Sequence, residues 1–174
     1  GEVRGVIHAA GVTDGALVQR RSIAACLAVM RPKIQGLYVL QRLFPVGELD
    51  FFVNCSSIGS VIPSVGQIAY CAANIFLDRW AADQALVSSA PCWSIGWDIW
   101  TESGMGRRSY QELKAAGAVP ELVRAKEIAL RNGITDREGA ETFVRLLAQS
   151  APHVVVSTQP LEDAVARRAR SIAD

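Results

Sequence analysis

A hydroxyl, a phenol and an amide follow one another in a short stretch of this sequence. Residues 56–74 read SSIGSVIPSVGQIAYCAAN, with Ser57 at the end of an apolar run and Tyr70 and Asn74 further along. Tyr70 and Asn74 are four residues apart, so on a helix both side chains project from one face. These groups could meet in one crevice and act on the oxygen of a bound carbonyl compound.

Reduction of a ketone is the chemistry that such a set would serve. A hydride must reach the carbonyl carbon while hydrogen-bond donors meet the oxygen that becomes negative. Ser57 would orient and polarise that oxygen, and Tyr70 would give the proton. An ordinary tyrosine pKa of about 10 is high for proton transfer near neutrality, and a nearby lysine ammonium would lower it.

Each of these residues also has a purely structural alternative. Ser57 could cap a turn or a helix, and Tyr70 could be a half-buried helix aromatic. His8 favours a structural role in a strand, because no second partner for its ring is evident in the sequence.

The elements that would position these residues alternate along the chain. Four nearly continuous apolar runs cover Val3–Ala10, Asp50–Ser57, Cys92–Asp98 and His153–Ser157, and helical patterns cover Ser22–Phe44, Gln67–Ser88 and the stretch Ser109–Ser150. Such runs fit strands buried on both faces. The alternation predicts a parallel α/β sheet with right-handed crossovers, in which ligands bind at the carboxyl ends of the strands.

Two local signals mark boundaries within the second half of the chain. Thr135 and Glu138 form a T-x-x-E capping box before an amphipathic helix. The polar, glycine-containing segment 102–108 is the one plausible seam, where a mobile segment could start.

Composition narrows the function classes. The 174 residues are 50% hydrophobic, enough for one packed core, and the net charge of +1 comes without a basic stripe. We therefore expect one globular unit with no nucleic-acid and no membrane partner. Two histidines and four scattered cysteines favour a cytoplasmic, metal-free protein with reduced thiols.

A series of motifs in order along the chain resembles the ketoreductase domains of modular polyketide synthases, which belong to the short-chain dehydrogenase/reductase superfamily. The motifs are His8-Ala9-Ala10-Gly11, Pro32-Lys33-Ile34-Gln35-Gly36, Ser56-Ser57, Tyr70-Cys71-Ala72-Ala73-Asn74-Ile75-Phe76-Leu77-Asp78, Trp97-Asp98-Ile99-Trp100 and Gly104-Met105. The resemblance implies a Rossmann-like, doubly wound sheet. It also implies a catalytic tetrad of Ser57, Tyr70, Lys33 and Asn74.

The same resemblance assigns further contacts and partners. Lys33 would lower the pKa of Tyr70 and reach the nicotinamide ribose, Asn74 would hold Lys33 or a water molecule, and Ala10, Gly11, Lys33 and Tyr70 would bind the cofactor, NADPH. The substrate would be a β-ketoacyl thioester on an acyl carrier protein. The division implied is a core over 1–101, a lid-like segment over 102–132 and a terminal helix, strand and helix over 133–174.

The Gly-rich turn that holds dinucleotide phosphates does not occur in these 174 residues. We expect the N-terminal half of the ketoreductase, with the other synthase domains, to supply it, and we expect this chain alone to be inactive. Three alternatives remain open: a non-catalytic structural subdomain, a ketoreductase of a fatty-acid-synthase-like system, and an interaction module.

Product stereochemistry has one weak signal. In the resembling family, the type giving one hydroxyl configuration carries L-D-D after HAAGV, and the opposite type carries a tryptophan eight residues before the tyrosine. This chain has Thr13-Asp14-Gly15 and Ile62 at these places. The retained Asp14 and the missing tryptophan favour the D-hydroxy product.

Overall fold

The computed structural model describes residues 1–13, 15 and 17–173, with side chains up to residue 170. Asp14, on which the stereochemical prediction partly depends, lies outside the described residues. The chain forms two compact units. The first unit comprises Gly1–Trp97 with Ser150–Asp174, and the second comprises Asp98–Gln149.

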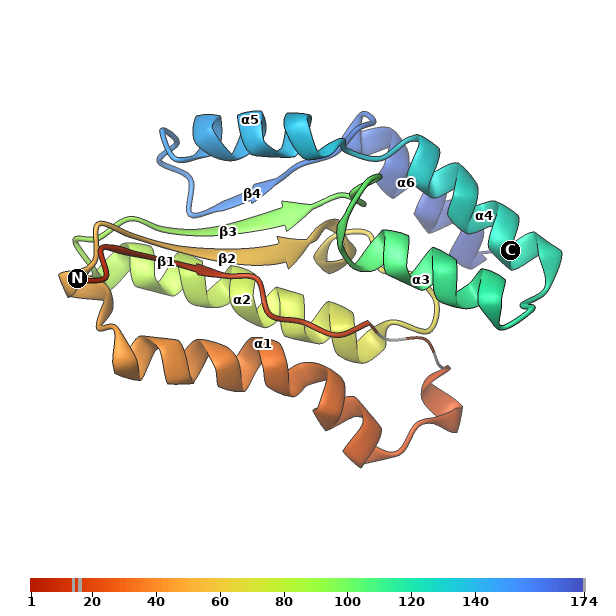
Figure 1. The fold of residues 1–174 in the computed structure, drawn as a ribbon, viewed down its shortest axis with the longest axis horizontal. Helices are drawn as coiled ribbons and strands as arrows, with labels where there is room; N and C mark the ends of the chain where they lie inside the picture. The colour runs from red at the N-terminus through yellow and green to blue at the C-terminus, as the bar shows by residue number, and fades with distance from the viewer. Residues whose placement is uncertain (14, 16, 174) are drawn as a thin grey trace. The chain divides into compact units, whose positions relative to one another are not determined.

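A four-stranded parallel sheet forms the centre of the first unit (Figure 1). Its strands pair in chain order: β1 (Gly5–His8), β2 (Phe51–Ser57), β3 (Cys92–Trp97) and β4 (His153–Val155). Every strand lies inside a predicted apolar run, and the predicted α/β class with a parallel sheet is confirmed. β1 is shorter than expected, because pairing with β2 extends only from Gly5 to His8.

Two long helices pack side by side on one face of this sheet (Figure 1). They are α1 (Ile23–Leu43) and α2 (Ile68–Val87), which agree with the predicted segments to within one residue at each end. Ser22 caps α1 by accepting a hydrogen bond from the backbone N–H of Ala25 at 3.1 Å. Gly66, with φ of 78°, supplies the left-handed backbone of the turn before α2.

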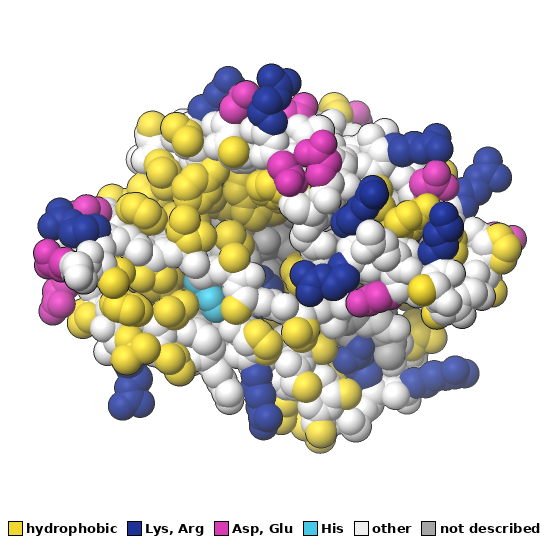
Figure 2. All heavy atoms as spheres, viewed as in Figure 1, with side chains coloured by type: hydrophobic (Ala, Val, Ile, Leu, Met, Phe, Trp, Pro, Cys, Tyr) yellow, Lys and Arg dark blue, Asp and Glu magenta, His cyan; other side chains and the backbone are white. Residues whose placement is uncertain are grey.

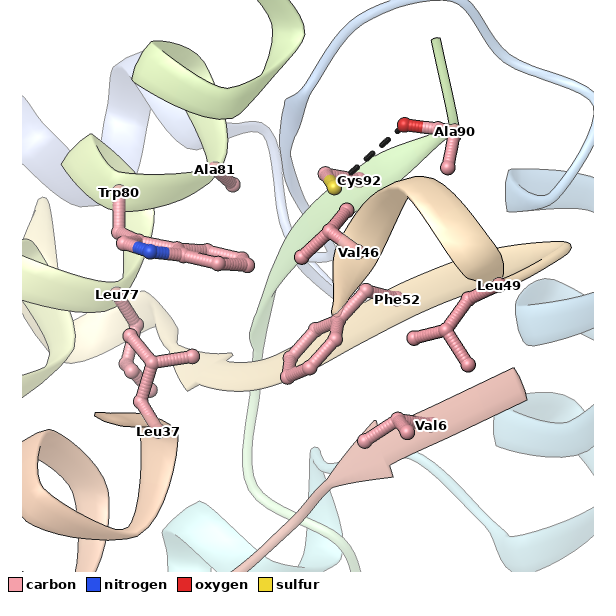
Figure 3. Close-up of a cluster of buried hydrophobic side chains, with 10 residues drawn as sticks. All are labelled: Val6, Leu37, Val46, Leu49, Phe52, Leu77, Trp80, Ala81, Ala90 and Cys92. Carbon is pink, nitrogen blue, oxygen red and sulfur yellow. Dashed lines mark hydrogen bonds between the residues drawn. The ribbon is translucent and has the colours of Figure 1, made fainter. Parts of the chain in front are cut away.

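The hydrophobic core lies between these helices and the sheet (Figure 3). Phe52 of β2 packs against Trp80 of α2 with ring centroids 5.0 Å apart, and Leu37 of α1 is fully buried beside them. Burial of each such side chain stabilises the fold by about 1.5–3 kcal/mol. This core fixes α1 and α2 against the strands whose ends carry the candidate site.

Further helices complete the described part of the first unit. The 3-10 helices found there are η1 (Val18–Arg20), η2 (Val46–Glu48) and η3 (Ile58–Ser60), and the α-helix α6 (Leu161–Ala173) follows β4. All four cysteines of the chain are free thiols.

The second unit consists of α3 (Gly104–Ala115), α4 (Pro120–Arg131) and α5 (Asp136–Leu146). The Thr135–Glu138 capping box at the start of α5 is confirmed. α3 begins inside the expected seam at 102–108, five residues before the predicted helical stretch. The reason is tertiary: Ser103 donates a hydrogen bond to Asp136 at 2.8 Å, and the Asp136 N–H donates to Glu102 at 3.0 Å.

One described helix, α1, is long and apolar enough to cross a membrane by length and composition. The core helix of a soluble protein passes the same test. In α1, 17% of the apolar window is buried, and the buried residues of the helix are Val29, Lys33 and Leu37. The face drawn in Figure 2 intersperses basic and acidic side chains among hydrophobic ones.

Candidate active site

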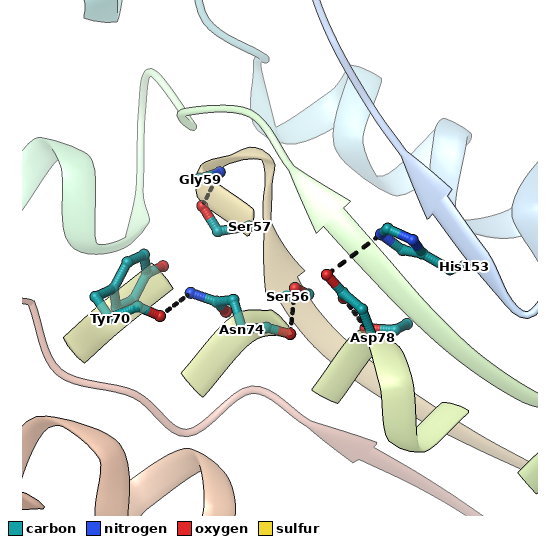
Figure 4. A network of polar contacts seen from close by, with 8 residues as sticks. Ser56, Ser57, Gly59, Tyr70, Asn74, Asp78 and His153 are labelled. Atoms are coloured by element: carbon teal, nitrogen blue, oxygen red, sulfur yellow. Dashed lines mark hydrogen bonds and ion pairs between the residues drawn. The ribbon is translucent and has the colours of Figure 1, made fainter. Parts of the chain in front are cut away.

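Three of the four predicted site residues lie where β2 ends and α2 begins (Figure 4). Ser57 is the last residue of β2. Tyr70 and Asn74 lie one turn apart near the start of α2. The Asn74 amide nitrogen donates to the backbone oxygen of Tyr70 at 2.8 Å. The side chains thus converge at the carboxyl end of a parallel strand, as the spacing predicts.

Ser57 also has the structural role that the sequence left open. Its hydroxyl accepts a hydrogen bond from the backbone N–H of Gly59 at 3.1 Å and so caps η3. A Cβ on Gly59 would lie 3.3 Å from this hydroxyl oxygen. The cap and the tight approach of Gly59 fix where the hydroxyl points.

Lys33, the fourth predicted site residue, is buried. Its side chain is only 2% exposed, and its ammonium donates to the backbone oxygen of Cys55 at 2.7 Å. Nζ lies 5.7 Å from the centroid of the Tyr70 ring. Burial lowers the pKa of Lys33 to about 8, against the opposing effects of Cys55 and Asp78. The ammonium is thus brought to the phenol from α1, far away in the sequence.

The expected lowering of the Tyr70 pKa is not found. Burial has the largest effect and raises this pKa above 10, while side-chain hydrogen bonds with Ser57 and Asn74 act in the opposite direction. Removal from water disfavours the phenolate more than the neighbours favour it. The phenol is therefore protonated at neutral pH, which is the form that can give a proton.

Among the described residues Asn74 makes no hydrogen bond to Lys33, the first of its two expected partners. Its amide nitrogen is used by the carbonyl of its own helix, and its buried Oδ1 has no hydrogen-bond partner among the described residues. Its backbone oxygen accepts a hydrogen bond from Ser56 at 3.3 Å. Of the two expected roles, the structure leaves Oδ1 free for a water molecule.

A row of polar side chains crosses the sheet below this site, and the sequence did not reveal it. His8, Asn54, Ser94 and His153 are register partners on β1, β2, β3 and β4. Ser94 donates to Asp78 of α2 at 2.6 Å. The other carboxylate oxygen of Asp78 lies 3.4 Å from Nε2 of His153 (Figure 4). The sequence of each strand does not show which residues of the neighbouring strands lie beside it. The row could be predicted only if the register of strand pairing were known.

Ala10 and Gly11 lie two and three residues after the end of β1, at the same edge of the sheet as Ser57. Ala10 is exposed and Gly11 half-buried. A ligand can therefore approach the backbone of both.

An apolar pocket opens beside the Tyr70 helix. It has a volume of about 300 Å³ and lies between residues 17–19 and the segment 63–71. Leu17, Pro63, Ile68 and Cys71 are among its lining residues. Burial raises the pKa of the Cys71 thiol, which keeps the thiol neutral.

A comparison with family models gives the decisive observation. The model described as the KR domain matches residues 1–102. The chain belongs to the KR-domain family. KR domains are nicotinamide-dependent ketoreductases, and the match includes all the predicted site residues.

Relatives of this KR-domain chain are polyketide synthases. The 5-methyl-1-naphthoate synthase of Streptomyces sahachiroi is 43% identical over 104 residues, which cover 60% of this chain and 6% of that protein. A polyketide synthase of Burkholderia thailandensis is 33% identical over 176 residues, 97% of this chain and 3% of that protein. This chain thus spans a small part of the length of these relatives.

Solved structures show the same fold. The ketoreductase from the first module of phoslactomycin biosynthesis in Streptomyces sp. HK803 superimposes with a TM-score of 0.75 at 24% identity. The alignment covers 97% of this chain and 36% of that one. The Rossmann-like fold of a polyketide-synthase ketoreductase is therefore confirmed.

Proposed function

We propose that this chain carries the proton-donating residues of a ketoreductase active site. The enzyme would reduce a β-ketoacyl thioester, held on an acyl carrier protein, to the β-hydroxyacyl thioester. The observation that carries the proposal is the buried Lys33 ammonium, which lies 5.7 Å from the Tyr70 ring centroid and donates to the backbone oxygen of Cys55, two residues before Ser57 on β2. A buried charge without a task costs stability, so its place beside a phenol favours a catalytic role.

The residues divide the reaction as follows. Ser57, fixed by its bond from Gly59, donates to the substrate oxygen and polarises the carbonyl group. Tyr70 gives its proton to that oxygen as negative charge develops there. Lys33 offsets the charge of the phenolate that remains. Asn74 stiffens α2 at Tyr70 and offers Oδ1 to a water molecule that can return the proton.

The residues present fit a nicotinamide dinucleotide. Lys33 uses one ammonium proton for Cys55, which leaves donors for the hydroxyls of a ribose. We propose that Ala10, Gly11, Lys33 and Tyr70 contact NADPH, which when bound would supply the hydride. The apolar pocket beside Cys71 offers room for part of the acyl chain.

We propose further that the phosphate-binding half comes from another segment of a cytoplasmic polyketide synthase. This chain covers 36% of a solved ketoreductase, which supports the existence of such a segment. We also propose that residues 102–132 act as a lid. The protein that joins this chain to such a segment is called the complete domain below. A non-catalytic subdomain and a fatty-acid-synthase-like ketoreductase are the rival functions. A buried, paired Lys33 favours the catalytic half.

The test is Tyr70→Phe in the complete domain. Ketone reduction should fall by a factor of 100 or more, on the order of the effect of a general acid, while NADPH affinity stays within about threefold. Turnover close to that of the wild type would reject the assignment.

A further inference from the structure

His8 joins the end of β1 to the backbone of Lys33. The imidazole is 2% exposed, and its Nε2 lies 2.8 Å from the carbonyl oxygen of Lys33. A carbonyl group only accepts, so Nε2 carries the proton and donates. This contact spans 25 residues of sequence and links the sheet to α1 at the lysine itself.

The ring also packs against Gly36, one turn after Lys33 on α1. A Cβ built on Gly36 would lie 3.0 Å from Cε1 of His8, which is closer than ordinary contact. Only a residue without a side chain leaves room for the ring. Gly36, in the segment Pro32-Lys33-Ile34-Gln35-Gly36, therefore provides the space that the His8 ring occupies.

His8 acts here as a neutral donor. Burial lowers its pKa, the hydrogen bond to Lys33 acts in the opposite direction, and the charge of Lys33 lowers the pKa further. A neutral ring with its proton on Nε2 suits the contact described above.

Lys33 is thereby fixed at both ends of its long side chain. His8 holds the backbone, and the Cys55 carbonyl oxygen holds the ammonium at 2.7 Å. A lysine side chain has many rotamers, so the position of Nζ depends on where the backbone of the lysine is held. A shift of α1 at this point would move the ammonium away from Tyr70.

We propose that His8 is a positioning residue that sets the place of the Lys33 ammonium through the backbone of α1. The proposal rests on the proposed function, because the task of Lys33 toward the cofactor and the phenol is part of that function. His8 touches neither the substrate nor the reacting atoms in this scheme.

Variants of the complete domain test the proposal through NADPH affinity, followed by fluorescence titration, and through kcat. His8→Leu removes the donor but keeps an apolar side chain of similar reach. His8→Gln keeps an N–H donor near the position of Nε2. We expect NADPH to bind roughly tenfold more weakly to the leucine variant, as for one lost hydrogen bond, and within about threefold of the wild type to the glutamine variant.

A double-mutant cycle separates this role from general stabilisation. In a Lys33→Ala background, His8→Leu should cause no further loss of NADPH affinity, because its effect acts through the missing ammonium. An equal loss in both backgrounds would overturn the proposal. So would equal affinities of the leucine and glutamine variants.

Asn54→Val is the matched control. Asn54 neighbours His8 in the same polar row, is fully buried and has no partner for either amide atom among the described residues. Its replacement should leave NADPH affinity unchanged, and a loss like that of His8→Leu would overturn the proposal. Where His8→Leu does not fold, His8→Asn takes its place, because its amide is too short to reach Lys33. The failure of the proposed function is seen separately, in Tyr70→Phe.

Discussion

At the scale of a single residue, burial of the Lys33 ammonium lowers the stability of the fold. Its ammonium is removed from water, and the pKa falls from the ordinary 10.5 to about 8. Between these two pH values the unfolded chain binds more protons than the folded chain, so stability rises with pH there. Below about pH 8 both states are charged and the cost of burial is fully present.

Lys33→Met should therefore stabilise the complete domain while it inactivates it. We expect the free energy of unfolding at pH 7 to increase by up to about 3 kcal/mol, which corresponds to the shift in the Lys33 pKa. Urea unfolding at pH 7 and pH 9.5 checks this, because the gain should shrink at the higher pH. Exposed Lys114→Met should change stability by less than about 0.5 kcal/mol. A methionine variant less stable than the wild type at pH 7 would contradict this account.

The prediction of the product configuration rests on two residues. Ile62 lies where the opposite type of the resembling family has a tryptophan, and Asp14 is retained in the sequence. We expect the complete domain to form chiefly the D-hydroxy product, as measured by chiral chromatography after hydrolysis of the thioester. A predominance of the L-hydroxy product would reject the prediction.

At the scale of elements, local signals predicted the helices of the first unit well. Ser22 caps α1 and Phe44 follows it, as the hydrophobic periodicity indicates. The start of α3 at Gly104 was not predictable, because contacts of Glu102 and Ser103 with the distant Asp136 fix it.

Spacing along the chain predicted that Ser57, Tyr70 and Asn74 converge. The burial and the electrostatic surroundings of the site residues could not be predicted from the sequence. The burial of Lys33, its bond to Cys55 and the raised pKa of Tyr70 depend on how α1 packs against β2. The partner of His8 was missed for the same reason, since Lys33 is 25 residues away.

The packing of α5 in the second unit gives an element-scale prediction. A Cβ on Gly139 would overlap the Trp100 ring, so Gly139→Ala forces the ring or the helix to move. We expect a loss of about 1–3 kcal/mol in unfolding free energy, typical of an overpacked site, measured by urea unfolding of the complete domain. Gly47→Ala, with no atom within 4 Å of the added Cβ, is the control. Equal stability of the two variants would show that Gly139 of α5 does not pack tightly against the Trp100 ring.

At the scale of the whole molecule, β1 is one of the two edge strands of the sheet. It pairs with β2 alone in the described chain, and Ile7 on it is 52% exposed. An apolar edge strand of this kind invites pairing with another strand. We propose that the segment with the Gly-rich turn pairs here.

NADPH binding by the 174-residue chain and by the complete domain should therefore differ. A dinucleotide is held chiefly through its pyrophosphate at a Gly-rich helix N-terminus, and this sequence has no such motif. We expect the complete domain to bind NADPH at least about a hundredfold more tightly in a fluorescence titration, equivalent to about 3 kcal/mol. Tight binding by the chain alone would point to a different cofactor site.

The polar row of His8, Asn54, Ser94 and His153 also bears on how the strands find their alignment during folding. Side chains alternate between the two faces of a strand, so a slip of one residue would turn the polar group of that strand away from the helices. A slipped β1 would place Ile7 beside Asn54, and a slipped β3 would separate Ser94 from Asp78. Buried polar groups tolerate such mismatches poorly. The hydrogen bonds of His8 to Lys33 and of Ser94 to Asp78 therefore favour one register of the sheet. That register sets where Ser57, at the end of β2, lies relative to Tyr70 on α2.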